Sequence, residues 1–189
     1  MRKLILSVHV SLDGFVAGSA GEMDWIVVDE EIFDETVKLT DAADTALYGR
    51  VTFDMMQDYW PKAGENPSAT KHDKEHSAWY NRVEKVVMSR TLSTSDLQNA
   101  KLVGADIVPE IEELKSTAGK NILIFGSPGA AHTLMNYNLI DEYWLFVNPV
   151  ILGNGIKLFS GIKDRVKLSL LSTKKFANGV LALNYLVVK

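Results

Sequence analysis

The order of strand-like and helix-like segments constrains the fold of this chain more than any single motif does. Strand-like runs rich in Ile, Leu, Val and aromatic residues lie at 4–10, 45–48, 85–88, 121–125, 142–147, 166–175 and 180–188. Up to Asp141 these runs alternate with helical patterns, which predicts parallel strands joined by helices. After Asp141 they follow one another, and Asn178-Gly179 marks a hairpin. We therefore expect one α/β domain over residues 1–189, with a mixed, mostly parallel sheet and a C-terminal antiparallel hairpin.

Amphipathic patterns predict the helices between these strands. They lie at 29–43, 49–60, 74–83, 109–118 and 128–137. The first carries acids near its N-terminus, where the helix dipole favours negative charge. Pro109 and Pro128 are each expected at the first position of a helix. Residues 61–70 hold two prolines and a glycine and are expected to form a loop.

Composition excludes several classes of function. The chain has no cysteine, which rules out disulfides, thiolate nucleophiles and cysteine-based zinc sites. A net charge of −4 with scattered Lys and Arg argues against nucleic-acid binding, and no apolar run reaches the length of a membrane helix. His72-Asp-Lys-Glu-His76 fits a zinc-peptidase pattern but lacks a third ligand, so we interpret it as an exposed polar helix start and expect no metal. We expect a cytoplasmic protein.

Three turns follow predicted strands and share a chemistry suited to phosphate. They are Gly49-Arg50-Val51-Thr52, Ser89-Arg90-Thr91 and Gly126-Ser127-Pro128-Gly129. Ligands of open α/β sheets bind at the carboxyl ends of strands, and helix N-termini and arginines bind anions. Each turn also has a simpler explanation: the third is a capped turn, Arg90 is a solvated arginine, and Arg50 pairs with Asp54 one helical turn later.

Motifs along the whole chain carry a family resemblance. They are Ser11-Leu-Asp-Gly14, Leu47-Tyr-Gly-Arg-Val-Thr52, Val87-Met-Ser-Arg-Thr91, Ile124-Phe-Gly-Ser-Pro-Gly129, Leu139-Ile-Asp-Glu-Tyr143 and Asn148-Pro-Val-Ile-Leu-Gly-Asn-Gly155. In this order they resemble the dihydrofolate-reductase-like superfamily, in particular the C-terminal reductase domain (RibD C-terminal domain) of the bifunctional deaminase-reductase of riboflavin biosynthesis. The resemblance implies a three-layer α/β fold, a homodimer, and NADPH-dependent reduction of a small heterocyclic substrate.

The resemblance also implies where NADPH binds. It assigns the cofactor pyrophosphate to the first turn, the adenosine 2'-phosphate to the second, further pyrophosphate contacts to the third, and the nicotinamide to the loop from Val10 to Trp25. The implied cofactor residues are Val10, Ala17, Gly18, Gly49, Arg50, Val51, Thr52, Ser89, Arg90, Thr91, Gly126, Ser127, Gly129 and Ala130. Pro128 stands where the family has a glycine and donates no amide, so the Ser127 hydroxyl is a candidate replacement contact.

The catalytic acid is left open by the sequence. The resemblance places a carboxylate on the first helix, where Glu30 is the first candidate and Asp29 and Glu31 are rivals; the alternative is that all three complement the helix dipole. Asp13 is a second candidate, and its alternative role is that of a turn former. The family's Asp-Pro segment for a phosphorylated substrate is absent, and Met55-Met-Gln-Asp-Tyr-Trp60 stands there instead, so a different substrate is possible. The other functions considered are a non-catalytic nucleotide-binding scaffold and a cofactor sensor.

Overall fold

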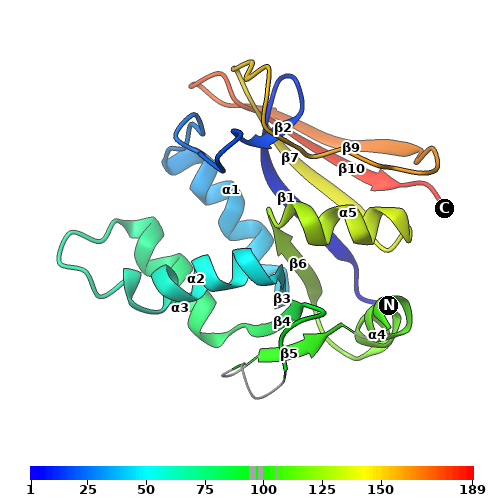
Figure 1. The fold of residues 1–189 in the computed structure, drawn as a ribbon. Helices are drawn as coiled ribbons and strands as arrows, with labels where there is room; N and C mark the ends of the chain where they lie inside the picture. Colours follow the sequence, from blue (N-terminus) through cyan, green and yellow to red (C-terminus); the bar gives the residue numbers. More distant parts are fainter. Residues whose placement is uncertain (94–96, 98–99, 105) are drawn as a thin grey trace. The chain divides into compact units, whose positions relative to one another are not determined.

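The computed structural model describes residues 1–93, 97, 100–104 and 106–189 (Figure 1). The strands are β1 (Leu4–Ser11), β2 (Phe15–Ala17), β3 (Ala43–Gly49), β4 (Glu84–Met88), β5 (Ala100–Val103), β6 (Asn121–Phe125), β7 (Glu142–Asn148), β8 (Ile156–Lys157), β9 (Leu168–Lys175) and β10 (Leu181–Val187). The helices are α1 (Glu30–Asp41), α2 (Arg50–Ala63), α3 (Lys71–Arg82), α4 (Ile107–Ser116) and α5 (Pro128–Asn136). Within the described part of the chain, no helix is both long and apolar enough to cross a membrane.

The chain forms two compact units. The first comprises Met1–Arg2 and Asp29–Leu123. Its strand order is β5-β4-β3-β6, and β3 runs parallel to β4 and β4 to β5. These strands are apolar because they are buried on both faces, as is typical of parallel sheets. Leu47, Tyr48 and Val87 are fully buried in them, and α3 adds Trp79 and Tyr80 to the core of this unit.

The second unit comprises Lys3–Val28 and Ile124–Lys189, so β6 contributes residues to both units. Its strand order is β6-β1-β7-β10-β9; β1 and β7 are parallel, whereas β10 is antiparallel to both of its neighbours. The β9–β10 hairpin, orange and red in Figure 1, turns at Gly179, whose φ is 90°. A separate short ribbon pairs β2 with β8. The predicted mixed, mostly parallel sheet with a C-terminal antiparallel hairpin is confirmed.

All predicted strands and helices are present, but two proline positions differ from expectation. The predicted loop at 61–70 is wrong at its start, because Pro61 lies inside α2, which ends at Ala63. This last turn is retained because Trp60 packs at 4.1 Å between ring centroids on His76 and Ala63 is buried. Pro109 is the third residue of α4, not the first. The first four amides of a helix have no partner within it, so a proline is tolerated there too.

The histidine pair of α3 is not the exposed polar start that the sequence predicted. Thr70 and Asp73 form a capping box that begins the helix at Lys71. His76 is buried, and the ring of His72 stacks on Phe33 with 3.7 Å between centroids. The pair belongs to an aromatic cluster that joins α1, α2 and α3. No group of three or more His, Cys, Asp or Glu side chains among the described residues is arranged to hold a metal.

Candidate functional site

In the first unit, the turn after β3 leaves the N-terminus of α2 open to an anion. Gly49 is the N-cap residue, with an extended backbone and no side-chain hydrogen bond to the first turn. No acidic residue lies in that first turn, and Arg50 is its first residue. Val51 is 74% exposed and therefore points away from the core. A helix start with a nearby guanidinium and no acid in its first turn suits a phosphate.

The turn after β4 is ordered by its own hydroxyl groups. The Ser89 amide donates to Val103 O at 3.0 Å, and Ser89 Oγ accepts from the amides of Thr91 and Leu92, each at 3.2 Å. Gly104 lies against this turn so closely that a Cβ atom there would stand 2.0 Å from Ser89 O. The close approach requires glycine and fixes the position of the Ser89–Thr91 backbone.

The structure brings these two predicted turns together. Arg50 Nη1 donates to Thr91 Oγ1 at 3.2 Å, and the same guanidinium lies 3.8 Å from the carboxylate of Asp54. The alternative ion pair of Arg50 with Asp54 is therefore present, but it is long and exposed, and such pairs contribute little to stability. Arg90 is exposed and forms no hydrogen bond or ion pair with any residue that the structure describes. Its guanidinium is available to a ligand.

In the second unit, the glycine-rich turn after β6 has an unusual backbone. Gly126 and Ser127 both lie in the left-handed region, with φ of 55° and 49°. Ser127 is the buried N-cap residue of α5 but makes no side-chain capping hydrogen bond, and Pro128 occupies the first helical position as predicted. At Gly126 and Gly129 an added Cβ would meet nothing within 4 Å. Space therefore adjoins the turn where the amides of Gly129 and Ala130 begin the helix.

The loop that follows β1 is tied to the segment near β8. Val10 is buried at the end of β1, and Ala17 is buried in β2, which pairs with β8. Gly155 approaches this ribbon closely, because a Cβ there would lie 2.2 Å from Ala17 O. The Gly18 amide donates to Glu22 O at 2.9 Å and closes a tight turn. The predicted nicotinamide loop is thus an ordered element of the second unit.

Asp13 holds that loop by accepting three hydrogen bonds. Its carboxylate accepts from Ser11 Oγ at 2.7 Å, from the Leu152 amide at 3.1 Å and from the Gly153 amide at 2.7 Å. Partial desolvation alone would raise the pKa of Asp13. The hydrogen bonds from Ser11, Gly153 and Leu152 outweigh it, so the pKa of Asp13 is lowered. The group is therefore an ionised acceptor at neutral pH, which favours an ordering role for it.

The candidate acids at the start of α1 have different surroundings. Asp29 is the N-cap residue, and its carboxylate accepts from the Ile32 amide at 3.0 Å; Glu30 and Glu31 are exposed. The buried carboxylate of this helix is Glu35, which pairs with Lys38 at 2.8 Å. Sequence reasoning missed Glu35, although its spacing between Ile32 and Leu39 places it on the buried stripe of the helix.

A second group that sequence reasoning missed is His9 with Asn148. Asn148 is fully buried at the end of β7, its Oδ1 accepts from the Val27 amide at 2.9 Å, and its Nδ2 donates to Phe146 O at 2.9 Å. The same Nδ2 lies 3.3 Å from His9 Nδ1, and the His9 ring stacks on Phe146 with 4.9 Å between centroids. The sequence signal was a polar residue inside an apolar run, in Ser7-Val8-His9-Val10.

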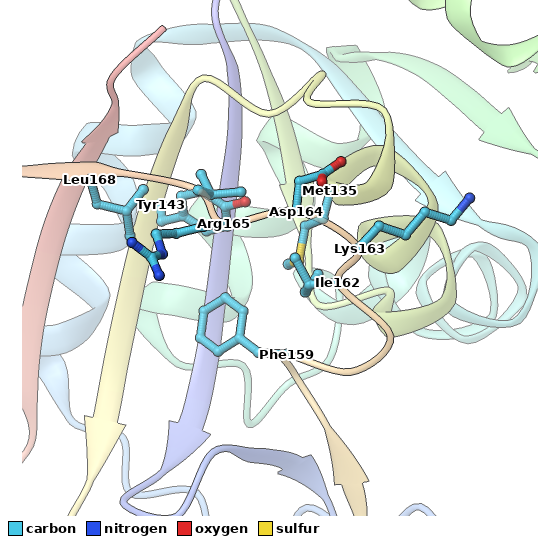
Figure 2. Close-up of a pocket in the computed structure, with 9 residues that line it drawn as sticks. Met135, Tyr143, Phe159, Ile162, Lys163, Asp164, Arg165 and Leu168 are labelled. Atoms are coloured by element: carbon cyan, nitrogen blue, oxygen red, sulfur yellow. The ribbon is translucent and has the colours of Figure 1, made fainter.

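The second unit also contains a cavity of about 410 Å³ that involves none of the predicted site residues (Figure 2). It is lined by Met135, Tyr143, Phe159, Ile162, Lys163, Asp164, Arg165, Val166 and Leu168. Met135 belongs to α5 and Tyr143 to β7, so this cavity marks the face of the sheet that α5 covers. It is distinct from the glycine-rich turn of the same unit.

The fold defines a class of protein. The mixed sheet with its antiparallel C-terminal hairpin is the dihydrofolate-reductase-like α/β fold, and solved structures with this fold superpose along the chain. A putative riboflavin biosynthesis protein from Shewanella sp. PV-4 matches with a TM-score of 0.76 at 20% identity, over 100% of both chains. Dihydrofolate reductase from Enterococcus faecalis, complexed with NADP(H), matches with a TM-score of 0.65 at 14% identity, over 99% of this chain and 97% of that one.

The chain belongs to the RibD C-terminal domain family, which it matches over residues 2–182. It is also 36% identical over 186 residues to the uncharacterized protein YyaP of Bacillus subtilis (strain 168), covering 97% of this chain and 94% of that protein. The suspected superfamily and fold are therefore confirmed.

Proposed function

We propose that this protein is a cytoplasmic NADPH-dependent reductase that transfers hydride to a small heterocyclic substrate. Membership of the RibD C-terminal domain family supports a reductase. The observation that carries the proposal is the hydrogen bond from Arg50 Nη1 to Thr91 Oγ1 at 3.2 Å. It gathers two arginines, two hydroxyls and a free helix N-terminus in one unit. This is the chemistry that two separate phosphate groups of one cofactor require.

The residues of the turns fit the phosphates of NADPH. Gly49, Arg50, Val51 and Thr52 would hold the pyrophosphate at the start of α2, and Ser89, Arg90 and Thr91 would hold the 2'-phosphate. In the second unit, Gly126, Ser127, Gly129 and Ala130 would be phosphate contacts at the start of α5, beside the open space at Gly126 and Gly129. Val10, Ala17 and Gly18 would line the nicotinamide. When bound, NADPH supplies the hydride.

The protein's own part in the reaction is to orient the substrate and deliver a proton. We propose Glu30 as the proton-delivering residue, with Asp29 as its rival at the same end of α1. The Asp29 carboxylate already accepts the Ile32 amide, whereas Glu30 is exposed at the first helical position. Asp13 is the substrate-side candidate of the second unit, as an ionised acceptor in an ordered loop rather than as an acid.

A titration of the purified protein with NADPH and with NADH, followed by nicotinamide fluorescence, tests the proposal. We expect tighter binding of NADPH, and we expect Arg90→Ala to bring it close to the NADH value. Arg165→Ala is the matched control, because Arg165 is also exposed and, like Arg90, has no ion pair with the described residues. Absence of binding by either nucleotide would exclude the reductase and leave a scaffold that has the fold without the site.

We also propose that the protein forms a homodimer through β9. This strand is at the edge of its sheet, and almost every residue in it is exposed, including Leu168, Leu170 and Leu171. Its first six residues carry no charge, and its two lysines, Lys174 and Lys175, stand at its C-terminal end. An exposed edge strand with apolar side chains is a template for pairing with another strand. A second copy of the chain offers such a strand in antiparallel orientation.

A further inference from the structure

The orientation of the Asn148 side-chain amide is fixed by two contacts in the second unit. Its oxygen must face a donor, which is the Val27 amide at 2.9 Å, and its nitrogen must face an acceptor, which is Phe146 O at 2.9 Å. If the amide were flipped, its oxygen would face the acceptor Phe146 O and its nitrogen would face the Val27 N–H donor, so both hydrogen bonds would be lost. The amide nitrogen of this fully buried side chain therefore points its second hydrogen toward His9.

This amide determines which nitrogen of His9 carries a proton. His9 Nδ1 lies 3.3 Å from Asn148 Nδ2, so it accepts a hydrogen bond and is unprotonated. A neutral imidazole then carries its hydrogen on Nε2. Burial lowers the pKa of His9 to about 4, so the ring is neutral at physiological pH. Stacking on Phe146, with planes inclined by 18°, holds the orientation of the ring.

Among the described residues, His9 Nε2–H has no hydrogen-bond acceptor. Nε2 forms no hydrogen bond with any described residue, and the side chain is only partly buried. His9 is paired with Phe146, whereas the α5-covered cavity contains Tyr143, three residues earlier on β7. Because side chains alternate along a strand, His9 lies on the face that α5 does not cover. It is also near the carboxyl end of β1, where parallel sheets bind ligands.

We propose that His9 is a substrate-binding residue of the reductase, oriented by Asn148 so that Nε2–H donates a hydrogen bond to an acceptor on the heterocycle, such as a ring carbonyl. This inference rests on the proposed function. A neutral imidazole donor distinguishes an oxygen acceptor from an amino group at the same ring position. The amino group is itself a donor, so its N–H would face the Nε2–H of His9 without forming a hydrogen bond. His9 is thus a specificity-determining residue, and Asn148 is the residue that positions it.

The tautomer can be measured directly by long-range ¹H–¹⁵N NMR of the histidine side chains, with His9→Phe used for assignment. We expect the Nε2–H form of His9 at neutral pH. With NADP⁺ at saturation, uracil and cytosine serve as probes, because a carbonyl oxygen and an N3–H group in uracil are replaced by an amino group and an unprotonated N3 in cytosine. Uracil should shift the His9 Nε2 resonance and bind roughly tenfold more tightly than cytosine, which corresponds to one hydrogen bond.

The variants separate this role from packing. His9→Phe keeps the ring stacked on Phe146 and should abolish the preference for uracil while leaving NADPH affinity unchanged. His132→Gln is the control; His132 lies on α5, with Nε2 2.9 Å from Lys157 O and 2.8 Å from Leu158 O. It should leave the preference intact.

An Nδ1–H tautomer at His9, an unmoved Nε2 resonance, or a preference that survives His9→Phe would overturn the proposal even if NADPH binds. Failure of NADPH to bind the native chain would instead remove the proposed function and the His9 assignment with it.

Discussion

Arg50 donates a hydrogen bond from Nη1 to Thr91 Oγ1 over 3.2 Å, joining the turn after β3 to the turn after β4. Neither residue is buried, so this contact contributes little to stability. Its consequence is geometric. The bond holds the Arg50 guanidinium beside the Ser89–Thr91 turn, and it places the proposed pyrophosphate and 2'-phosphate contacts in a fixed relation within the first unit.

The two arginines should differ in what they recognise. Arg50→Ala should weaken the binding of NADPH and NADH by a similar factor, about ten- to a hundredfold, because both cofactors contain the pyrophosphate. Arg90→Ala should weaken only NADPH. Fluorescence titrations of both cofactors against both variants measure this. A selective loss of NADPH binding in Arg50→Ala would reverse the assignment of the two turns.

Gly104 and Gly129 form a matched pair for testing the turns. A Cβ at Gly104 would stand 2.0 Å from Ser89 O, so Gly104→Ala must displace backbone and should cost about 1–3 kcal/mol of unfolding free energy. A Cβ at Gly129 meets nothing, so Gly129→Ala should be tolerated or slightly stabilising. Urea unfolding of both variants gives the comparison. If ligand phosphate fills the space at Gly129, that variant should bind NADPH more weakly although its fold is intact.

Acidification should destabilise the protein before its carboxylates titrate. Burial lowers the pKa of His9 to about 4 and of His76 to about 3, whereas an unfolded chain binds protons at histidine near pH 6.5. Between pH 6.5 and 4.5 the unfolded state therefore holds more protons, and the unfolding free energy falls by up to about 1.4 kcal/mol per pH unit for each histidine.

The pKa values of Asp44 and Asp73 are also lowered in the folded chain. Protonation of these carboxylates decreases the unfolding free energy only at pH values below this window. Urea unfolding at pH 7.0, 5.5 and 4.5 should show how steeply the unfolding free energy falls with pH. This slope should be smaller in His76→Phe. An unchanged slope in His76→Phe would show that the pKa of His76 is not lowered in the folded state.

Asp13 should order the loop next to β8 rather than donate a proton. Asp13→Ala removes the acceptor of the Leu152 and Gly153 amides, so hydrogen exchange at these two amides should accelerate. Exchange at the amides of β10 is the internal control and should not change. Asp13→Asn keeps an acceptor oxygen and should retain part of the protection. Slow exchange in Asp13→Ala would mean that other contacts hold the loop.

The edge strand β9 should control the oligomeric state. Leu170→Lys places a charge at the uncharged centre of this strand and should convert the dimer to a monomer without loss of thermal stability in the monomer. Met55→Lys is the control, since Met55 on α2 is 51% exposed and Leu170 is 52% exposed. Light scattering after gel filtration distinguishes the species. A dimer that persists in Leu170→Lys would place the interface elsewhere.

The fold was largely predictable because the apolar runs of the strands and the Asn178-Gly179 turn are local signals. The elements that were missed are β2, β5 and β8, which are short and carry little apolar periodicity. Pro61 was misassigned because tertiary packing of Trp60 and Ala63 outweighs the local preference of proline. The burial of His76 was missed for the same reason, since its aromatic partner Trp60 comes from another helix.

The candidate site was predictable only where residues adjacent in the sequence make up a turn. The spacing of Gly49–Thr52 and Ser89–Thr91 suggested phosphate contacts, but no local pattern shows that Arg50 reaches Thr91. The relation between His9 and Asn148 was also hidden, because it depends on the register that places His9 next to Phe146. Glu35 is a different case, because its spacing from Ile32 and Leu39 places it on the buried stripe of α1 from the sequence alone.

The second unit is assembled from two segments, Lys3–Val28 and Ile124–Lys189, and Asp29–Leu123 of the first unit lie between them along the chain. β1 is made before residues 29–123 of the first unit, whereas its neighbours β6 and β7 are made only at the end of that unit and after it. The apolar strand 4–11 therefore stays unpaired while residues 29–120 are made, and an exposed apolar strand of this kind is prone to aggregate. The first unit, whose β3, β4 and β5 pair among themselves, has no such delay and is free to fold first.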